Sequence, residues 1–328
     1  MTNDDFVIHQ IRDEILQRRR FLLTSHARPD CDSIGSQLAM AFALDALGKE
    51  VRIVNADAAP DHYQGFPGMH RIEITTEVDT DADAVIVMEC SDLSRTGITG
   101  LDSRFIINID HHAGNRLYGA LNWYDETAAA CGEMVFDLIR ALGVPLTEQI
   151  ATHIYLAILT DTGAFHHSNI TPRTFDICRQ TVEAGVNPAA MARRVFDSNS
   201  FGKLKLIGAV LDSMVLLDEG RLAVLYLDDE MLQLCGCTHN DTEGLINLPL
   251  TAREIQAVVF FKIAPRGVVR VSMRSKYDVD VRQVAAQYGG GGHKNAAGFT
   301  VDGSLDELRP RLIERLVMAI GEGLLTRP

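Results

Sequence analysis

Short apolar runs alternate with helical patterns over about the first 200 residues, and this alternation constrains the fold more than any other feature of the sequence. Strands are predicted at residues 21–24, 51–54, 84–88 and 105–109, and helices at residues 33–47, 132–142 and 148–159. The first helix should end at Gly48, because glycine commonly terminates helices. The alternation predicts an α/β fold, with a parallel sheet and helices on both of its faces. Ligands of such sheets bind beyond the carboxyl ends of the strands.

The second half of the chain follows a different pattern. Strands are predicted at residues 221–227, 255–263 and 268–274, followed by a glycine-rich turn at 289–293 and a closing helix at 304–325. Mixed strands and helices predict a smaller α+β domain. The length of 328 residues also fits two domains. We therefore expect domains at residues 1–195 and 211–328, with a linker region at 196–210.

Composition narrows the class of protein further. Hydrophobic residues make up 46% of the chain and charged residues 23%, which is typical of a protein with a buried core. No apolar run approaches the roughly 20 residues that span a bilayer, and the charged N-terminus lacks a signal-peptide core. We expect a cytoplasmic protein with no membrane partner and with reduced cysteines. Cys235 and Cys237 lack a second pair at zinc-finger spacing, which favours structural thiols.

The net charge of −13 is unevenly distributed. Residues 1–202 hold 16 basic and 28 acidic side chains, a net charge of −12, whereas the remainder holds 15 and 16, a net charge of −1. Proteins that coat long nucleic acids by neutralising phosphates are usually basic. Either nucleic acid is not the ligand, or groups other than Lys and Arg side chains bind its phosphates.

Acidic residues and histidines gather at or just after four apolar segments. The clusters are His26 with Asp30 and Asp32, Glu89, Asp110 with His111 and His112, and Asp161. Each residue alone could serve a loop or a helix end. Together, however, they are harder to explain in this way, because several strands each end in a carboxylate or histidine at the edge where α/β sheets place their ligands. Five carboxylates at one point would repel one another by several kcal/mol unless cations neutralised them.

This ligand set indicates which metals fit. Carboxylates with imidazole and no thiolate favour Mn²⁺ or Mg²⁺ over structural zinc. The acids suffice for two ions about 3.5–4 Å apart, a pair that generates hydroxide near neutral pH and supports in-line phosphoryl displacement. The helix that begins near Ser33 and Gly35 would add N–H donors for a phosphate oxygen. The sequence thus predicts a metal-dependent phosphoesterase.

Several motifs resemble those of one known family. The tetrapeptide IDHH at 109–112 resembles the signature of the DHH phosphoesterase superfamily, SHARPDCDSIGS at 25–36 its first motif, and Asp161-Thr-Gly its fourth. GGGGHKNAAGF at 289–299 is similar to the DHH-associated C-terminal domain. The resemblance covers about residues 20–320 in the family order, and the branch it most resembles is that of nanoRNases (oligoribonucleases) that also hydrolyse 3′-phosphoadenosine 5′-phosphate.

The resemblance implies roles for the clustered residues. One metal would be held by His26, Asp30 and Glu89, and the other by Asp32, Glu89, His111 and Asp161. Asp110 would bind a metal directly or support its ligands, and His112 would face the scissile phosphate and stabilise its charge. Glu89 departs from the family, whose second motif usually has Asp. Because Glu is one methylene longer, bridging geometry and metal preference could shift.

The second domain is expected to bind the nucleotide. Consecutive glycines let backbone N–H groups approach a ligand without Cβ obstruction, and an arginine at a strand end offers a planar fork for a terminal phosphate. The residues concerned are Arg274, Gly289, Gly290, Gly291, Gly292 and His293.

The predicted activity is Mn²⁺-dependent, with two ions and Mg²⁺ as a possible substitute. It would degrade short oligoribonucleotides to 5′-mononucleotides and dephosphorylate 3′-phosphoadenosine 5′-phosphate. Alternatives are a phosphodiesterase for linear pApA or cyclic di-AMP and, in another class, a nucleotide-binding regulator whose catalysis is impaired by Glu89. The resemblance also implies a homodimer. Two divalent cations would return four positive charges to the acidic domain. The acidic composition of this domain therefore fits a site in which bound metal ions contact the phosphates of short nucleotides.

Overall fold

The computed structural model describes residues 3–59, 63–79, 81–197, 199–242, 244–264 and 267–325. By internal contacts the chain divides into two compact units, Met1–Ser198 and Asn199–Pro328. Most of the stretch expected to be a linker, 196–210, forms helix α7 (Phe201–Asp212). Leu206 and Val210 of this helix are buried in a core of the second unit. None of the described helices is long and apolar enough to cross a membrane.

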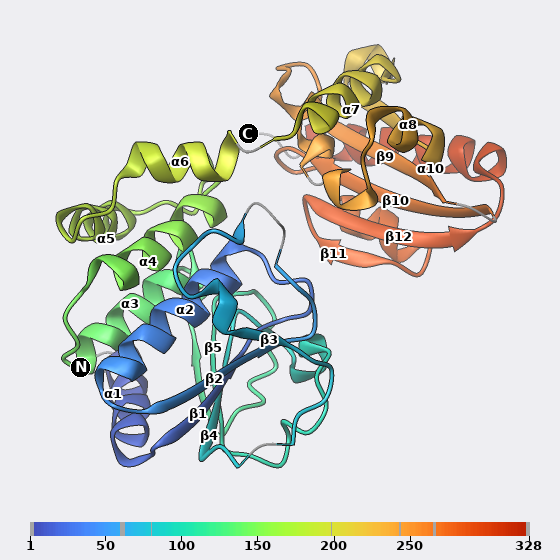
Figure 1. The fold of residues 1–328 in the computed structure, drawn as a ribbon. Coiled ribbons are helices and arrows are strands. Elements are labelled where there is room, and N and C mark those ends of the chain that lie inside the picture. Colours follow the sequence, from blue (N-terminus) through green and yellow to red (C-terminus); the bar gives the residue numbers. More distant parts are fainter. Residues whose placement is uncertain are drawn as a thin grey trace. The chain divides into compact units, whose positions relative to one another are not determined.

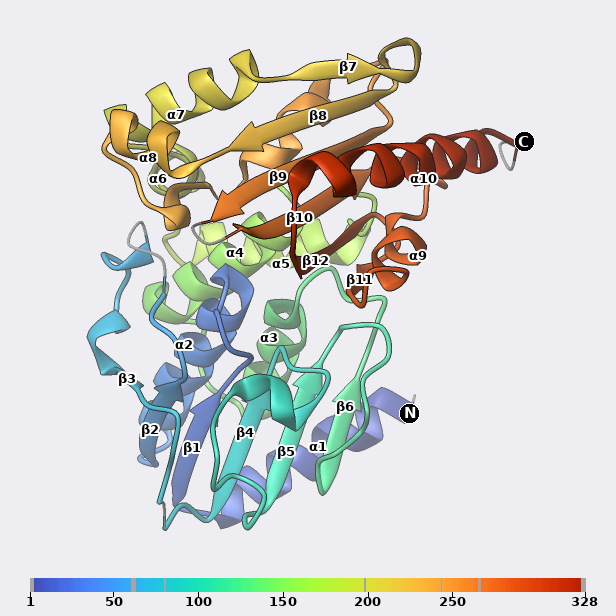
Figure 2. The same cartoon turned by 90° about the vertical axis from the view of Figure 1, so that its right-hand side faces the viewer.

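The first unit, shown in Figure 1, contains a parallel sheet of six strands in the order β3-β2-β1-β4-β5-β6. In Figure 2 the strands β2, β1, β4, β5 and β6 follow one another from left to right. The strands are β1 (Arg20–Thr24), β2 (Glu50–Asn55), β3 (Ile72–Ile74), β4 (Ala84–Met88), β5 (Ile106–Asp110) and β6 (Leu121–Tyr124). The central strands β4 and β5 are buried along their whole length, as expected for near-continuous apolar runs in a parallel sheet. The strand order reverses between β1 and β4, which pair directly, and ligands bind at such a switch point.

The α-helices of this unit lie on one side of the sheet and share one hydrophobic core with it (Figure 2). They are α1 (Asn3–Gln17), α2 (Cys31–Ala46), α3 (Cys131–Ala141), α4 (Glu148–Asp161), α5 (Pro172–Glu183) and α6 (Pro188–Phe196). The α/β class and the parallel sheet are confirmed. On the other face, however, the described residues that cover the sheet come from loops and from the 3₁₀ helix Leu93–Thr96, not from α-helices. Gly97 and Gly100, both at positive φ, interrupt this connection before a longer helix can form.

The second unit contains a mixed sheet in the order β11-β12-β10-β9-β8-β7. The strands are β7 (Val215–Leu217), β8 (Leu222–Leu227), β9 (Ala257–Ala264), β10 (Val268–Ser275), β11 (Gly291–His293) and β12 (Ala296–Asp302). Helices α9 (Val281–Ala286) and α10 (Leu305–Leu325) join one core, and α7 and α8 (Asp229–Cys235) join the other. In α10, Leu308, Leu312, Leu316 and Ile320 recur every four residues and form its buried face.

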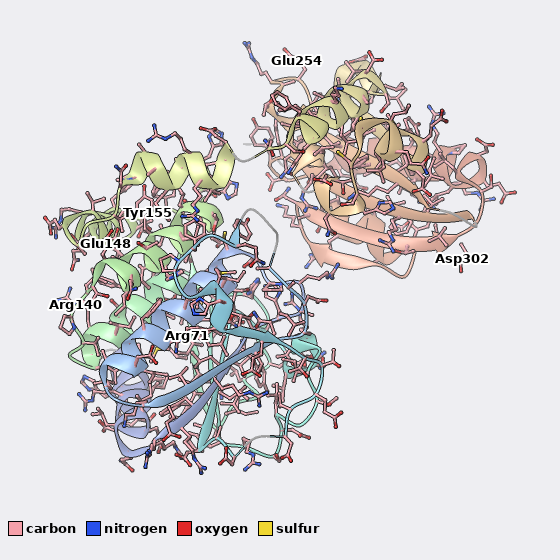
Figure 3. All side chains as sticks on the ribbon, viewed as in Figure 1. Arg71, Arg140, Glu148, Tyr155, Glu254 and Asp302 are labelled. Atoms are coloured by element: carbon pink, nitrogen blue, oxygen red, sulfur yellow. The ribbon has the colours of Figure 1, made fainter. Side chains whose placement is uncertain are left out.

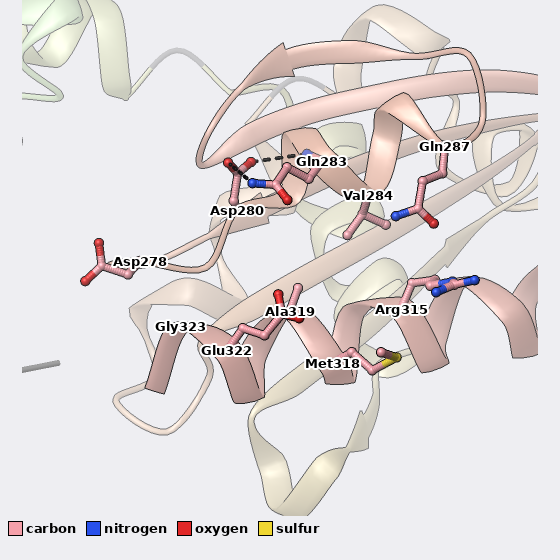
Figure 4. A pocket seen from close by; sticks show the side chains of 10 residues that line it. All are labelled: Asp278, Asp280, Gln283, Val284, Gln287, Arg315, Met318, Ala319, Glu322 and Gly323. Atoms are coloured by element: carbon pink, nitrogen blue, oxygen red, sulfur yellow. Dashed lines mark hydrogen bonds between the residues drawn. The ribbon is translucent and has the colours of Figure 1, made fainter. Parts of the chain in front are cut away.

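A cavity of about 250 Å³ lies between α9 and α10 (Figure 4). Asp280 at its rim accepts hydrogen bonds from the backbone and side-chain amides of Gln283, each at 3.2 Å. Arg315, Met318 and other residues of α10 complete the lining. No substrate-binding residue predicted from the sequence belongs to the described lining, and the candidate site below does not include this cavity.

Candidate active site

Three helices of the first unit converge at the carboxyl edge of its sheet, because two glycines let them approach closely. A Cβ atom at Gly35 of α2 would lie 2.6 Å from a backbone oxygen of α4, and one at Gly132 of α3 would lie 2.5 Å from the Cβ atom of Ala157. Helix α4 runs past Tyr155, which is labelled in Figure 3, and ends at Asp161. The first turns of α2 and α3 and the last turn of α4 thereby meet.

Asp32 lies in the first turn of α2, and only 1% of it is exposed. Its carboxylate accepts the backbone N–H of Cys131 at 2.6 Å and that of Gly132 at 3.0 Å, both in the first turn of α3, and the Ser36 hydroxyl at 3.0 Å. These donors and the positive end of the α3 dipole fix its orientation. Burial and the negative charge of Asp161 nevertheless raise the pKa of Asp32 to about 7.

His111 follows β5 and faces three carboxylates. Its Nδ1–H group donates a hydrogen bond to the carbonyl oxygen of Ala128 at 3.0 Å. Its Nε2 atom points at Glu89 Oε1 at 3.2 Å, Asp161 Oδ2 at 3.6 Å and Asp32 Oδ2 at 3.8 Å. Burial lowers the pKa of His111, but the hydrogen bond to Glu89 and the surrounding charges outweigh it and raise that pKa to about 11. A carbonyl-anchored Nδ1 is typical of a histidine that binds metal through Nε2.

Glu89 follows β4 with a φ of 58°, a left-handed conformation that is costly for a residue with a Cβ atom. Its side chain is buried, and Oε1 lies 3.4 Å from Nδ1 of His112. The other oxygen, Oε2, accepts no hydrogen bond from the described residues. Burial and the nearby charge of Asp32 hold the pKa of Glu89 well above its usual value. A buried carboxylate oxygen of this kind is stabilised by a proton or by a cation.

Asp110 is the last residue of β5 and is fully buried. Its Oδ1 atom accepts a hydrogen bond from Nδ1 of His112 at 2.9 Å, and its Oδ2 atom accepts one from the amide of Asn115. Burial opposes ionisation of Asp110, but these bonds outweigh it and lower the pKa. Asp110 therefore sets the orientation of the His112 ring.

His26 and Asp30 follow β1. Ser33 Oγ lies 2.9 Å from His26 Nε2, and Asp30 Oδ2 lies 3.8 Å from the same nitrogen. Asp30 also caps α2, because its Oδ1 atom accepts the backbone N–H of Ser33 at 2.9 Å. This cap corrects one expectation, since the Ser33 N–H donates to Asp30 and is not directed at a phosphate. The ring centroids of His26 and His112 are 6.4 Å apart.

The structure brings five of the predicted residues into two groups, each with ligand atoms within 4.8 Å of one another. The groups are Glu89 with His111 and His112, and Asp32 with His111 and Asp161. His26, Asp30 and Asp110 belong to neither group among the described residues. Burial also raises the pKa of Asp161, to about 6. Both groups could hold a metal ion, and a cation would relieve the crowding of their negative charges.

No cysteine belongs to either of these two groups among the described residues. The Cys90 thiol donates to the carbonyl of Asp92 at 3.1 Å, and the Cys131 thiol to that of Ile109 at 3.5 Å. Burial raises the pKa of Cys90 to about 11 and that of Cys131 well above its usual value. The available donors are thus carboxylate oxygens and imidazole nitrogens, a set that fits Mn²⁺ or Mg²⁺ better than a thiolate-preferring ion.

The glycine-rich segment of the second unit is partly a strand and not only the turn that its composition predicts. Gly289 and Gly290 donate their backbone N–H groups to Ala286 and Ala285 at the end of α9, at 3.2 and 3.0 Å. Gly291 begins β11, an edge strand that pairs with β12. The N–H groups of Gly289 and Gly290 are thus already hydrogen-bonded to the end of α9. Gly291 and Gly292 are the glycines of this segment that we expect to contact a ligand.

Arg274 lies near the end of β10 and pairs with Ala296 of β12, which in turn pairs with His293 of β11. These three backbone positions form one row across the sheet. The side chain of His293 lies outside the described part of the structure. Burial lowers the pKa of Arg274, whose guanidinium donates to the carbonyl of Met273 at 3.1 Å.

Several residues of the site could not be found from sequence patterns. Asn115, which holds Asp110, and Ala128, whose carbonyl anchors His111, lie in connections with no distinctive motif. The two N–H groups that hold Asp32 come from a segment about 100 residues away. One signal was available in the sequence. The small residues at 128–132 lead into a predicted helix, and the first N–H groups of a helix have no partner within the helix, so they can bind another group.

A parallel sheet with clustered carboxylates and histidines at its switch point defines a metal-dependent phosphoesterase of the α/β class. The chain belongs to the DHH family. The model of the DHH family N-terminal domain matches residues 20–158, and that of the DHHA1 domain matches residues 228–322.

Known proteins resemble the chain over most of its length. The bifunctional oligoribonuclease and PAP phosphatase NrnA of Thermus thermophilus is 33% identical over 295 residues, which cover 89% of this chain and 87% of the relative. The protein of the same name from Bacillus subtilis is 27% identical, with 85% and 88% covered. The crystal structure of an exopolyphosphatase-related protein from Bacteroides fragilis superposes with a TM-score of 0.89 at 24% identity, covering 96% of each chain. That likeness establishes the fold.

Proposed function

We propose that this protein degrades short oligoribonucleotides to 5′-mononucleotides and dephosphorylates 3′-phosphoadenosine 5′-phosphate. The observation that carries the proposal is the position of His111 Nε2, within 3.2–3.8 Å of three carboxylates from three different segments. Relatives named as oligoribonuclease and PAP phosphatase, at 33% and 27% identity, support this choice of substrates.

We assign His26, Asp30 and Glu89 to one divalent cation, and Asp32, Glu89, His111 and Asp161 to a second, with Mn²⁺ as the preferred ion. The unpartnered Oε2 atom of Glu89 and the absence of thiolates from the described cluster support the assignment. When bound, the ions supply a hydroxide nucleophile near neutral pH and neutralise charge on the phosphate.

The remaining residues act on the substrate. Asp110 holds the Nδ1–H of His112, and we assign to His112 the contact with the scissile phosphate. In the second unit, Arg274 offers a planar pair of donors for a terminal phosphate, and Gly291 and Gly292 offer a strand edge without side chains. His293 follows in the same strand and is proposed to contact the nucleotide.

Glu89→Asp is expected to keep activity within about tenfold of the wild type, because a carboxylate remains, and to change the ratio of activity with Mn²⁺ to that with Mg²⁺. Aspartate also tolerates positive φ better than glutamate, so stability should rise by up to about 1 kcal/mol. Glu89→Gln is the matched control and should lose at least about 100-fold. Steady-state rates with each metal and thermal unfolding test this. A fully active Gln variant would exclude Glu89 as a metal ligand.

The proposal is tested by incubating the protein and Mn²⁺ with RNAs of two to about ten nucleotides, with 3′-phosphoadenosine 5′-phosphate, with linear pApA and with cyclic di-AMP. We expect the fastest release of 5′-mononucleotide from the shortest RNAs, together with phosphate release from 3′-phosphoadenosine 5′-phosphate. If cyclic di-AMP alone were hydrolysed, the proposed substrates would be wrong and cyclic di-AMP would take their place. Nucleotide binding without any turnover would favour a regulator over an enzyme of this specificity.

A homodimer and a cytoplasmic location remain predictions. Sedimentation of the purified protein tests the first of these.

A further inference from the structure

The bend before α3 together with the first residues of that helix (residues 128–132, called the turn below) shapes two of the proposed ligands at once. The carbonyl of Ala128 accepts the Nδ1 proton of His111 at 3.0 Å. The N–H groups of Cys131 and Gly132, three and four residues on, hold the carboxylate of Asp32. A displacement of this turn would therefore move both the imidazole and the carboxylate that face the proposed cation.

The side chain of Asn169 fastens this turn to the end of α4. Its Nδ2 atom lies 2.9 Å from the carbonyl oxygen of Ala129 and 3.4 Å from that of Asp161. Both partners are acceptors, so only a donor satisfies them, and this requirement fixes the amide orientation. One side chain thus joins the turn that shapes His111 and Asp32 to the backbone of Asp161.

The connection between α4 and Asn169 has an unusual backbone, which its own backbone N–H groups close in part: Ala164 donates to Leu159 at 2.8 Å and His166 to Thr162 at 2.9 Å. Gly163, Ala164 and Phe165 have φ values of 57°, 58° and 64°, so three consecutive residues are left-handed, beginning two positions after Asp161. Ala164 and Phe165 carry Cβ atoms, for which this conformation is strained. The hydroxyl of Thr162 accepts the N–H of Phe165 at 3.1 Å and supports the bend from within. Asn169 supports it from the other end.

We infer that Asn169 is a positioning residue, which sets the separation of Asp161 from His111 and Asp32 and thereby the affinity of the site for a divalent cation. The inference rests on the proposed function, since it takes these three residues as ligands of one cation. Asn169 itself donates only to backbone oxygens in the described contacts. Its loss should loosen the ligand geometry without removing a ligand.

The decisive variant is Asn169→Leu, which keeps the branched shape of asparagine but removes the donor. Asn187→Ala is the matched control, because Asn187 caps α6 in the same unit through the N–H of Ala190 and has no described contact with the cluster. The readouts are Mn²⁺ affinity by isothermal titration, the electron paramagnetic resonance spectrum of bound Mn²⁺, and thermal unfolding in EDTA.

Asn169→Leu is expected to bind Mn²⁺ about 10- to 100-fold more weakly, with an altered spectrum and a fall in kcat that exceeds any change in KM. Asn187→Ala should lower the unfolding temperature but leave Mn²⁺ affinity within twofold. Wild-type affinity in Asn169→Leu would overturn the inference, whereas failure of the wild type to bind Mn²⁺ would overturn the proposed function instead. If Asn169→Leu does not fold, Asn169→Ser and Asn169→Ala decide: the serine hydroxyl should retain part of the affinity, and equal affinities would overturn the donor role.

Discussion

Replacing Asp161 with alanine is expected to reduce kcat on a diribonucleotide by about 10³-fold or more, while the protein stays folded. Asp161 ends α4, and its Oδ2 atom lies 3.6 Å from His111 Nε2. Its removal takes one carboxylate from the group that includes Asp32, and a loss of about 4 kcal/mol of transition-state stabilisation corresponds to this factor. Steady-state kinetics at saturating Mn²⁺ measure the effect.

The same variant should unfold in EDTA at a temperature equal to or above that of the wild type. Without a cation, Asp161 contributes repulsion to a group that already contains Asp32, and burial disfavours its charge. Asp197→Ala, which changes a residue at the end of α6, serves as the control and should be fully active. A near-normal rate for Asp161→Ala would show that the metal assignment is wrong.

Removal of divalent cations is expected to abolish turnover, and Mn²⁺ at about 100 times its dissociation constant should restore it and raise the unfolding temperature by at least about 5 °C. Each ion that binds only the folded state stabilises it by about 2.7 kcal/mol at that concentration, which corresponds to about 5–10 °C for a unit of this size.

Differential scanning calorimetry with EDTA, Mn²⁺ and Mg²⁺ separates the two parts of this expectation. The transition of the first unit should move, because it contains both groups of ligands, and that of the second unit should not. Full activity after exhaustive chelation would contradict a metal-dependent mechanism.

The sequence predicted the location of the site better than its internal geometry. Glu89 and Asp110 follow or end apolar runs, and the carboxyl ends of parallel strands share one edge, so strand periodicity alone brought them together. The position of Asp32 against α3 depended on the glycines at 35 and 132, whose effect appears only when the helices are packed. The periodicity of apolar residues carries no information about how closely two helices approach each other.

At two places a hydrogen bond within the chain competed with the ligand contact that we expected, and the sequence could not show which of the two would form. A helix that begins near Ser33 suggested N–H groups for phosphate, but Asp30, three residues before, caps the helix with its own carboxylate. Four consecutive glycines suggested a ligand loop, but Gly289 and Gly290 close α9. In both places a nearby partner within the chain took the donor that we expected to serve a ligand. Asn169 illustrates the opposite case, in which an unremarkable residue gains its role from long-range contacts.

We propose above all that the carboxylates and histidines at the switch point bind two divalent cations. Anomalous scattering from crystals soaked in MnCl₂ tests it most directly. We expect two Mn²⁺ peaks per chain, both in contact with Glu89, one also with His111 and the other with His26. No peak within bonding distance of His111 Nε2, at Mn²⁺ concentrations that support turnover, would contradict it.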